Sequence, residues 1–133
     1  MPDFLDTSVV VRYLTADPPQ LAQKAKALIE GTACFEITET VLLESAHVLR
    51  SLYGITREDT VDLLAALVKR SNIEVHGLSE SLMTAGLALV RPSNRVSLGD
   101  ALIWAVANQC TPSRVHTCDQ RFPPAGIDLR LVA

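Results

Sequence analysis

The chain has 133 residues, of which 48% are hydrophobic, which is enough for one domain with a hydrophobic core and too few for two such domains. Twelve Lys and Arg residues against 15 Asp and Glu residues give a net charge of −3. This charge balance excludes a protein that holds nucleic acid through a broad basic surface. Local cations or bound metal would have to attract any nucleic acid.

The N-terminal residues carry no basic region before an apolar one, so they do not predict a signal peptide. No apolar run approaches the length of a membrane span, so no membrane association is expected. The three cysteines are an odd number without metal-binding spacing and lie in apolar runs. We therefore expect buried thiols in a reducing compartment and a cytoplasmic protein.

The first part of the chain alternates short apolar segments with segments of helical periodicity. Pro19 is typical of a helix start and Gly31 of a position just past a helix end. In chain order, the predicted elements are a strand at 4–5, helices at 7–14 and 19–30, a strand at 33–37 and a helix at 40–53. In the last of these helices, the spacing predicts a buried stripe that contains Glu44 and consists of Val41, Ser45, Val48, Leu49 and Leu52.

The second part of the chain continues the same alternation. Residues 56–59 resemble a capping box, and Ser79 is a typical N-cap residue. The predicted elements are helices at 56–71, 79–89 and 98–110, strands at 73–76, 115–118 and 128–132, and a polar loop at 91–96. Within the helix at 98–110, the pattern predicts an apolar stripe of Ile103, Ala107 and Cys110 that also contains Asp100.

Strands that alternate with helices are typical of the α/β class with a largely parallel sheet. Parallel sheets are usually covered on both faces. The sequence therefore predicts a single domain over residues 1–133, with a mainly parallel central sheet of about five short strands and helices on both faces.

Four carboxylates are candidates for a common site. Asp6 and Asp119 each come at the end of a predicted strand, where parallel α/β sheets place their ligands. Glu44 and Asp100 lie early in helices and within apolar stripes, where a lone charge is costly. Converging carboxylates repel one another unless a cation lies between them, and Mg²⁺ and Mn²⁺ prefer oxygen ligands. One or two such ions can hold a phosphodiester and stabilise its leaving oxygen.

Each carboxylate also has a simpler interpretation. Asp6 could cap the helix that follows it. Asp100 could be the acidic member of a capping box that begins at Ser97. Asp119 could be a turn residue, and Glu44 could lie at the rim of the core by chance. The signal is therefore their joint placement rather than any one residue.

The chain resembles PIN-domain proteins, most closely the VapC-type toxin ribonucleases. The matching stretches are LDTSVVVRYLTADPPQ at 5–20, TVLLESAHVLRSLYGITRED at 40–59, SLGDALIWAVA at 97–107 and TCDQRF at 117–122. The resemblance implies a PIN-like fold and a metal-dependent endoribonuclease that is the toxin of a toxin–antitoxin pair. It also implies a homodimer and a cognate antitoxin that blocks the acidic pocket.

The same resemblance assigns roles to individual residues. It implies that Asp6, Glu44, Asp100 and Asp119 coordinate Mg²⁺ or Mn²⁺ and carry out catalysis, with hydrogen-bond support from Thr7 and Thr117. The sequence departs from the family pattern at two positions: Ser97 stands where many relatives have another Asp, and Gln120 where a basic residue is frequent. The change at Ser97 affects a second metal site, and the change at Gln120 affects contact with phosphate. All four acids of the family pattern are present.

Three arginines near the acids are candidates for RNA-phosphate contacts, although solvated surface charge is the commoner role for any one of them. They are Arg91, Arg95 and Arg121. Trp104 and Tyr53 are expected to serve the core rather than to stack on bases. The alternative function is a non-catalytic PIN-like module that binds RNA or protein, because a sequence does not show turnover.

Overall fold

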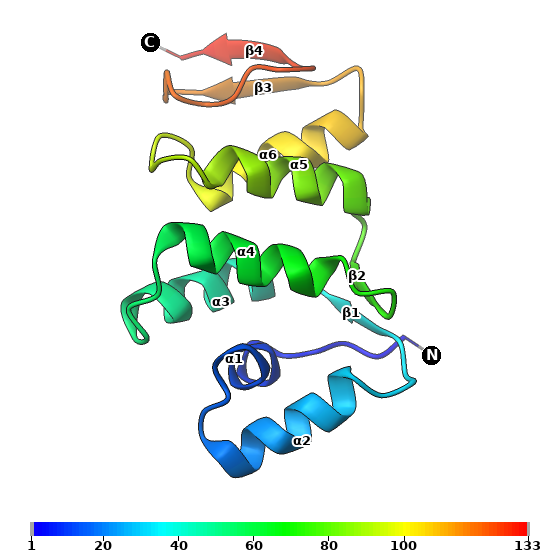
Figure 1. Cartoon of the computed structure of the whole chain (residues 1–133). Helices are drawn as coiled ribbons and strands as arrows, with labels where there is room; N and C mark the ends of the chain where they lie inside the picture. The colour runs from blue at the N-terminus through cyan, green and yellow to red at the C-terminus, as the bar shows by residue number, and fades with distance from the viewer. Residues whose placement is uncertain (1, 133) are drawn as a thin grey trace. The chain divides into compact units, whose positions relative to one another are not determined.

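The structure is a computed structural model that describes residues 2–132. Its elements, shown in Figure 1, are α1 (Thr7–Thr15), α2 (Pro19–Ile29), β1 (Phe35–Ile37), α3 (Glu39–Ser51), α4 (Arg57–Val68), β2 (Ile73–Val75), α5 (Glu80–Val90), α6 (Leu98–Gln109), β3 (Arg114–Thr117) and β4 (Asp128–Leu131). The predicted helices and their order are confirmed, with ends that differ by a few residues.

The chain divides into two compact units, residues 1–76 and residues 77–133. Unit 1 contains α1 to α4 with β1 and β2, and unit 2 contains α5 and α6 with β3 and β4. None of the helices within residues 2–132 has the length and apolar character that crossing a membrane requires.

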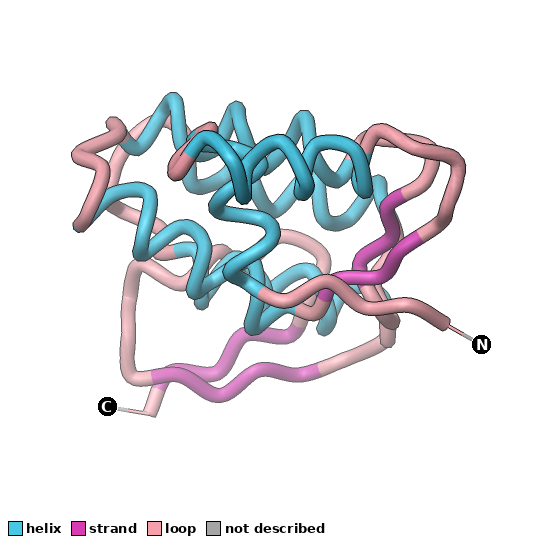
Figure 2. The backbone as a smooth tube through the Cα atoms, turned by 90° about the horizontal axis from the view of Figure 1, so that it is seen from below, coloured by secondary structure: helices cyan, strands magenta, loops and turns pink. Residues whose placement is uncertain are grey.

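The predicted sheet of five strands is wrong. The described residues form two separate two-stranded sheets, β1 with β2 and β3 with β4, both parallel (Figure 2). The predicted first strand makes only an isolated bridge, from Phe4 to Glu36. Alternation of apolar residues predicts that a segment is extended, but it does not state which strand becomes its partner. A central sheet with helices on both faces is therefore replaced by one small sheet in each unit.

Unit 1 is built by helices that pack on one another and on the inner face of the first sheet. Contacts join α1 to α2 and α3, α3 to α4, and α4 to β2. In the sheet, Phe35 and Ile37 pair in register with Ile73 and Val75, and all four side chains are buried. The strands are short, but their apolar side chains therefore fall on one face, as a period of two residues requires.

The segment before α1 is held against β1, and this position determines where Asp6 lies. Glu36 accepts a hydrogen bond from the amide of Leu5 at 3.0 Å, and its own amide donates to the carbonyl of Asp3 at 2.8 Å. Leu5 is buried, and the chain turns into α1 directly afterwards. Asp6 therefore lies at the junction of an extended segment and a helix, as the sequence predicts.

Unit 2 contains a close pair of helices. An added Cβ at Gly86 of α5 would lie 3.3 Å from the carbonyl oxygen of Ala101 in α6, which is tighter than an ordinary contact. The buried face of α6 consists of Ala101, Leu102, Trp104 and Ala105. The predicted stripe is therefore wrong, because Ile103 is 52% exposed. Small residues let the two helices approach closely, and this selects the face that carries Ala101 and Ala105.

The cysteines and Tyr53 also differ from expectation. Cys34, Cys110 and Cys118 are free and exposed rather than buried. Cys34 directly precedes β1, Cys110 is the C-cap residue of α6, and Cys118 directly follows β3, so each lies at the boundary between an element and a loop. Trp104 is in the core as predicted, whereas Tyr53 is 39% exposed.

Candidate functional site

Asp6 occupies the N-cap position of α1 without acting as a side-chain cap. Its backbone is extended, with φ −82° and ψ 158°, and its side chain makes no capping hydrogen bond. The carboxylate instead accepts a bond from the hydroxyl of Ser8 at 2.9 Å. The positive end of the helix dipole stabilises a negative charge at this position. The capping interpretation therefore does not account for this carboxylate, which is exposed.

Glu44 lies on α3 beside the buried stripe rather than inside it. Val41, Ser45 and Leu49 are buried as predicted, but the predicted stripe is wrong at Val48, which is only half-buried, and at Glu44, which is exposed. Leu52, which also fits the helical spacing of the apolar face, is 77% exposed. Glu44 thus carries no burial penalty. With Val48 and Leu52, at intervals of one turn, it forms a second face of the helix.

Asp6 and Glu44 line the same cavity of about 420 Å³ in unit 1. The cavity lies between the start of α1, the segment after it and the face of α3 that carries Glu44. Its lining residues are Asp6, Thr7, Ser8, Val11, Arg12, Asp17, Pro18, Glu44, Val48, Leu52 and Tyr53. The structure therefore brings together two of the four predicted acids, and adds a third carboxylate, Asp17, that the sequence did not single out.

Two polar groups in this wall have no partner within the described residues. The Oγ1 of Thr7 and the Nε of Arg12 are both buried without a hydrogen bond. The predicted support of an acid by Thr7 is therefore not made as a hydrogen bond in this structure, and Ser8 donates to Asp6 in its place. The Arg12 guanidinium donates from Nη1 to the carbonyl of Ser8, with an N···O distance of 3.3 Å.

Asp100 is the third residue of α6 in unit 2, and it does not complete a capping box. The hydroxyl of Ser97 accepts a bond from the Asp100 amide at 3.1 Å, which is the usual N-cap interaction. Among the described residues, no return bond runs from the Ser97 amide to the Asp100 carboxylate. The side chain of Asp100 is therefore not needed for capping, and it precedes the buried Ala101 just as Glu44 precedes the buried Ser45.

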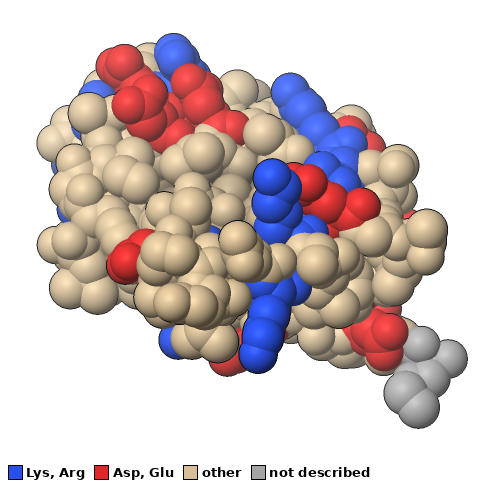
Figure 3. Space-filling model, turned by 60° about the horizontal axis from the view of Figure 1, so that its bottom comes forward, with Lys and Arg blue, Asp and Glu red and all other residues tan. Residues whose placement is uncertain are grey.

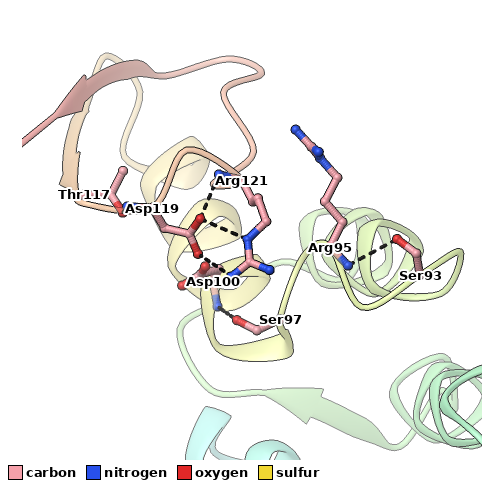
Figure 4. A network of polar contacts seen from close by, with 7 residues as sticks. All are labelled: Ser93, Arg95, Ser97, Asp100, Thr117, Asp119 and Arg121. Atoms are coloured by element: carbon pink, nitrogen blue, oxygen red, sulfur yellow. Dashed lines mark hydrogen bonds and ion pairs between the residues drawn. The ribbon is translucent and has the colours of Figure 1, made fainter. Parts of the chain in front are cut away.

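Asp119 follows β3 and is held by hydrogen bonds (Figure 4). Its carboxylate accepts bonds from the amide of Arg121 at 2.8 Å and from the Nε of Arg121 at 3.2 Å. These two bonds, in that order, lower the pKa of Asp119, and the charges of Arg121 and Arg95 add to the effect. The hydroxyl of Thr117 accepts a bond from the Asp119 amide at 3.0 Å, so Thr117 supports the backbone rather than the carboxylate.

The candidate arginines of unit 2 differ in their surroundings. In Figure 4 the Asp100 carboxylate points toward the pair of Asp119 and Arg121, while Arg95 directs its guanidinium away from that pair. Arg91 is the exposed C-cap residue of α5. On the face drawn in Figure 3, acidic and basic side chains occur in small neighbouring groups with uncharged surface between them. This face shows no broad basic field, which agrees with the net charge.

Comparison with protein families gives one match: the model of the PIN domain matches residues 4–126. The chain belongs to the PIN domain family. PIN domains are generally nucleases, and PIN nucleases typically use divalent metals. No curated protein matches the chain.

The donor chemistry of both carboxylate pairs fits the metals of PIN nucleases. Within either unit, the described residues contain no group of three or more His, Cys, Asp and Glu side chains placed to hold a metal ion. Mg²⁺ is usually bound by only one or two carboxylates, and it keeps several waters. Asp6 with Glu44, and Asp100 with Asp119, supply oxygen ligands of that kind. That all four acids share one site stays a prediction.

Proposed function

We propose that the chain is a metal-dependent endoribonuclease, with residues 1–133 acting as one PIN-like domain. The observation that carries this proposal is the cavity of unit 1, where Asp6 and Glu44 lie together and neither carboxylate is used for capping or packing. The family match, which covers residues in both units, supports the same function.

In the proposed mechanism, Asp6, Glu44, Asp100 and Asp119 would hold Mg²⁺ or Mn²⁺ directly or through waters. When bound, the ion supplies Lewis acidity for attack of water on a phosphodiester of RNA. Ser8 orients the Asp6 carboxylate through its hydroxyl bond. Arg95 and Arg91 are the proposed contacts to RNA phosphates in unit 2, with Arg121 as a third.

The hydrogen bonds of Asp119 favour one role over another. A general base works best when its pKa is near the working pH. Arg121 lowers the pKa of Asp119, so this carboxylate stays ionised and is a poor proton acceptor. Asp119 is therefore proposed as a metal ligand, and the proton of the attacking water is left to one of the other acids.

The test of activity is cleavage of total cellular RNA with and without Mg²⁺ or Mn²⁺, followed by mapping of the cut ends. Asp6→Asn is the diagnostic variant, because it removes the charge and keeps the shape of the side chain. Cleavage that requires the metal and is lost in Asp6→Asn supports the proposal. Full activity of the variant in a nuclease-free preparation would remove Asp6 from the site.

We further propose that the enzyme is a VapC-type toxin, a homodimer, and the partner of a cognate antitoxin that blocks the acidic pocket. The support is the similarity of residues 5–20 and 40–59 to that group. A cytoplasmic location is proposed with it, since the three exposed thiols stay reduced there. Expression should arrest growth, and co-expression of the adjacent small gene product should relieve the arrest. A neighbouring product that neither binds nor relieves arrest contradicts the toxin role and leaves the nuclease role open.

The second candidate function is a non-catalytic PIN-like module that binds RNA or protein. The pairing of Arg121 with Asp119 favours it, because an internal cation already neutralises one of the four acids. Such a module would bind RNA equally well with metal or chelator and would leave the RNA intact. The cleavage assay therefore separates the two functions.

A further inference from the structure

The cavity of unit 1 is lined by residues that the proposed chemistry does not use. Asp6 and Glu44 form one part of its wall, and Asp17, Leu52 and Tyr53 form another. Its volume of about 420 Å³ lies within the range of about 300–1,000 Å³ that small-molecule sites occupy. The cavity therefore has room for a group attached to a phosphodiester held at the acids.

An aromatic ring and a carboxylate are held together in the wall of this cavity. The hydroxyl of Tyr53 donates a hydrogen bond to Oδ2 of Asp17 at 2.8 Å, which joins the segment after α1 to the end of α3. Tyr53 is 39% exposed and the neighbouring Leu52 is 77% exposed, so neither serves the core. Exposed aromatic rings beside a nucleic-acid track are the usual stacking surfaces for unpaired bases.

Arg12 places a cation in the same cavity. Its Nη1 contacts only a backbone carbonyl, its Nε is buried without a partner, and it makes no ion pair within residues 2–132. A guanidinium that lies among carboxylates without pairing with them keeps its donors for a ligand. Phosphate is the ligand that matches this planar, charged group.

We propose that this cavity is a nucleotide subsite of the nuclease, in which Tyr53 stacks on a base, Asp17 selects guanine, and Arg12 holds the adjoining phosphate. An ionised carboxylate only accepts hydrogen bonds. Guanine is the RNA base whose Watson–Crick edge presents two neighbouring donors, the N1–H and the N2 amino group, so it matches Asp17 best. The inference rests on the proposed function, because the phosphate at the acids brings the base within reach.

Nucleotide binding tests the subsite without any need for turnover. The probes are 5′-GMP and 5′-UMP, which contain no phosphodiester to cleave, measured by ligand-observed NMR on the whole protein with Mg²⁺ present. Tyr53→Ala should weaken binding of both nucleotides by about 5- to 150-fold, the range for loss of a base–aromatic stack. Asp17→Asn should keep the stack and reduce the preference for GMP over UMP by about tenfold or more.

A matched control is available within unit 1. The hydroxyl of Tyr13 bonds to Glu30 at 2.9 Å, and neither residue lines the cavity. Tyr13→Phe should therefore leave nucleotide binding unchanged. Tyr53→Phe removes the hydrogen bond that holds the Asp17 carboxylate in place, so it should lower the preference for GMP. Circular dichroism of each variant checks the fold, and Asp17→Asn carries the test alone if Tyr53→Ala does not fold.

The outcomes separate this inference from the proposed function. Equal binding of GMP and UMP to the wild type, or a preference that survives Asp17→Asn, overturns the subsite even if RNA is cleaved. Preference for GMP that depends on Tyr53 supports it even if no RNA is cleaved, and then only the nuclease role fails. If the Tyr53 variants lose binding of a partner protein and keep nucleotide binding, the cavity is a protein-docking surface and the inference is wrong.

Discussion

Substitution of Asp100 separates a metal ligand from a helix cap, and Ser97 provides the matched control. In the metal-free protein, Ser97→Ala removes the hydroxyl that accepts the Asp100 amide and should lower the free energy of unfolding by about 0.5–2 kcal/mol. Asp100→Ala removes no capping bond. It loses only the interaction of an acidic side chain with the helix dipole, about 0.3–1 kcal/mol, and relief of repulsion between carboxylates offsets part of this loss.

Bound metal should reverse the order of stability of Ser97→Ala and Asp100→Ala. When only the folded state binds Mn²⁺, a Mn²⁺ concentration of 100 times the Kd raises the free energy of unfolding by about 2.7 kcal/mol. At about 4 °C per kcal/mol for a chain of this size, the melting temperature of the wild type should rise by about 10 °C. Ser97→Ala should show the same rise from a lower starting point, because its carboxylates are intact. Asp100→Ala should lose most of the rise.

The assay is thermal unfolding followed by circular dichroism at 222 nm over a titration of Mn²⁺. The decisive quantity is the difference between the melting temperatures with and without metal, compared across the three proteins. An equal rise in wild type and Asp100→Ala would refute the role of Asp100 as a ligand. A loss of the rise in Ser97→Ala would show that the helix start, rather than the carboxylate, controls metal binding.

Three further predictions follow from individual contacts. Asp6→Asn should nearly abolish RNA cleavage. It should change the free energy of unfolding by no more than about 0.5 kcal/mol, as substitutions at other exposed positions do. A loss of more than about 2 kcal/mol, measured by urea denaturation, would instead indicate a structural role for Asp6. Arg121→Ala should raise the pKa of Asp119 only part of the way to its ordinary value of 3.8, because the largest cause of the lowering is the bond from the backbone amide, which the variant keeps. Because folding lowers the pKa of Asp119, the ionised carboxylate stabilises the fold above its ordinary pKa, and this stabilisation is lost as the pH falls through the folded pKa. Arg121→Ala should therefore lose less stability on acidification than the wild type. Carboxyl NMR titration measures the pKa of Asp119, and an unchanged pKa in the variant contradicts the assignment. Trp104→Phe removes the indole bond to the carbonyl of Ala125 at 2.8 Å and should cost about 1–2 kcal/mol, and a smaller cost in denaturant titration would mean that water replaces the bond.

The starts of α4, α5 and α6 were readable from local sequence because capping is a short-range interaction. Thr56, Ser79 and Ser97 each accept a bond from the amide three residues later, as their positions predict. The inner face of β1 follows from the sequence in the same way, since alternation by two residues places Phe35 and Ile37 on one side. These features depend on residues within one turn or one strand, and the sequence states those neighbours directly.

The partners of each element were decided only by the tertiary structure. Five extended segments were predicted, but their pairing into two small sheets depends on which segments meet. The buried face of α6 depends on α5, where Gly86 admits Ala101 and Ala105 and leaves Ile103 exposed. An apolar side chain fits more than one packing, and only its neighbours select among them.

The candidate site shows the same division. The sequence itself indicated four acids as candidates, because Asp6 and Asp119 follow predicted strands, whereas Glu44 and Asp100 lie early in helices and interrupt predicted apolar stripes. It could not show that Asp6 bonds to Ser8 instead of capping α1, because both arrangements have the same spacing. Nor could it show the bond between Tyr53 and Asp17, which are far apart along the chain. Contacts between distant segments arise only when the helices pack, and they decide what a carboxylate is free to bind.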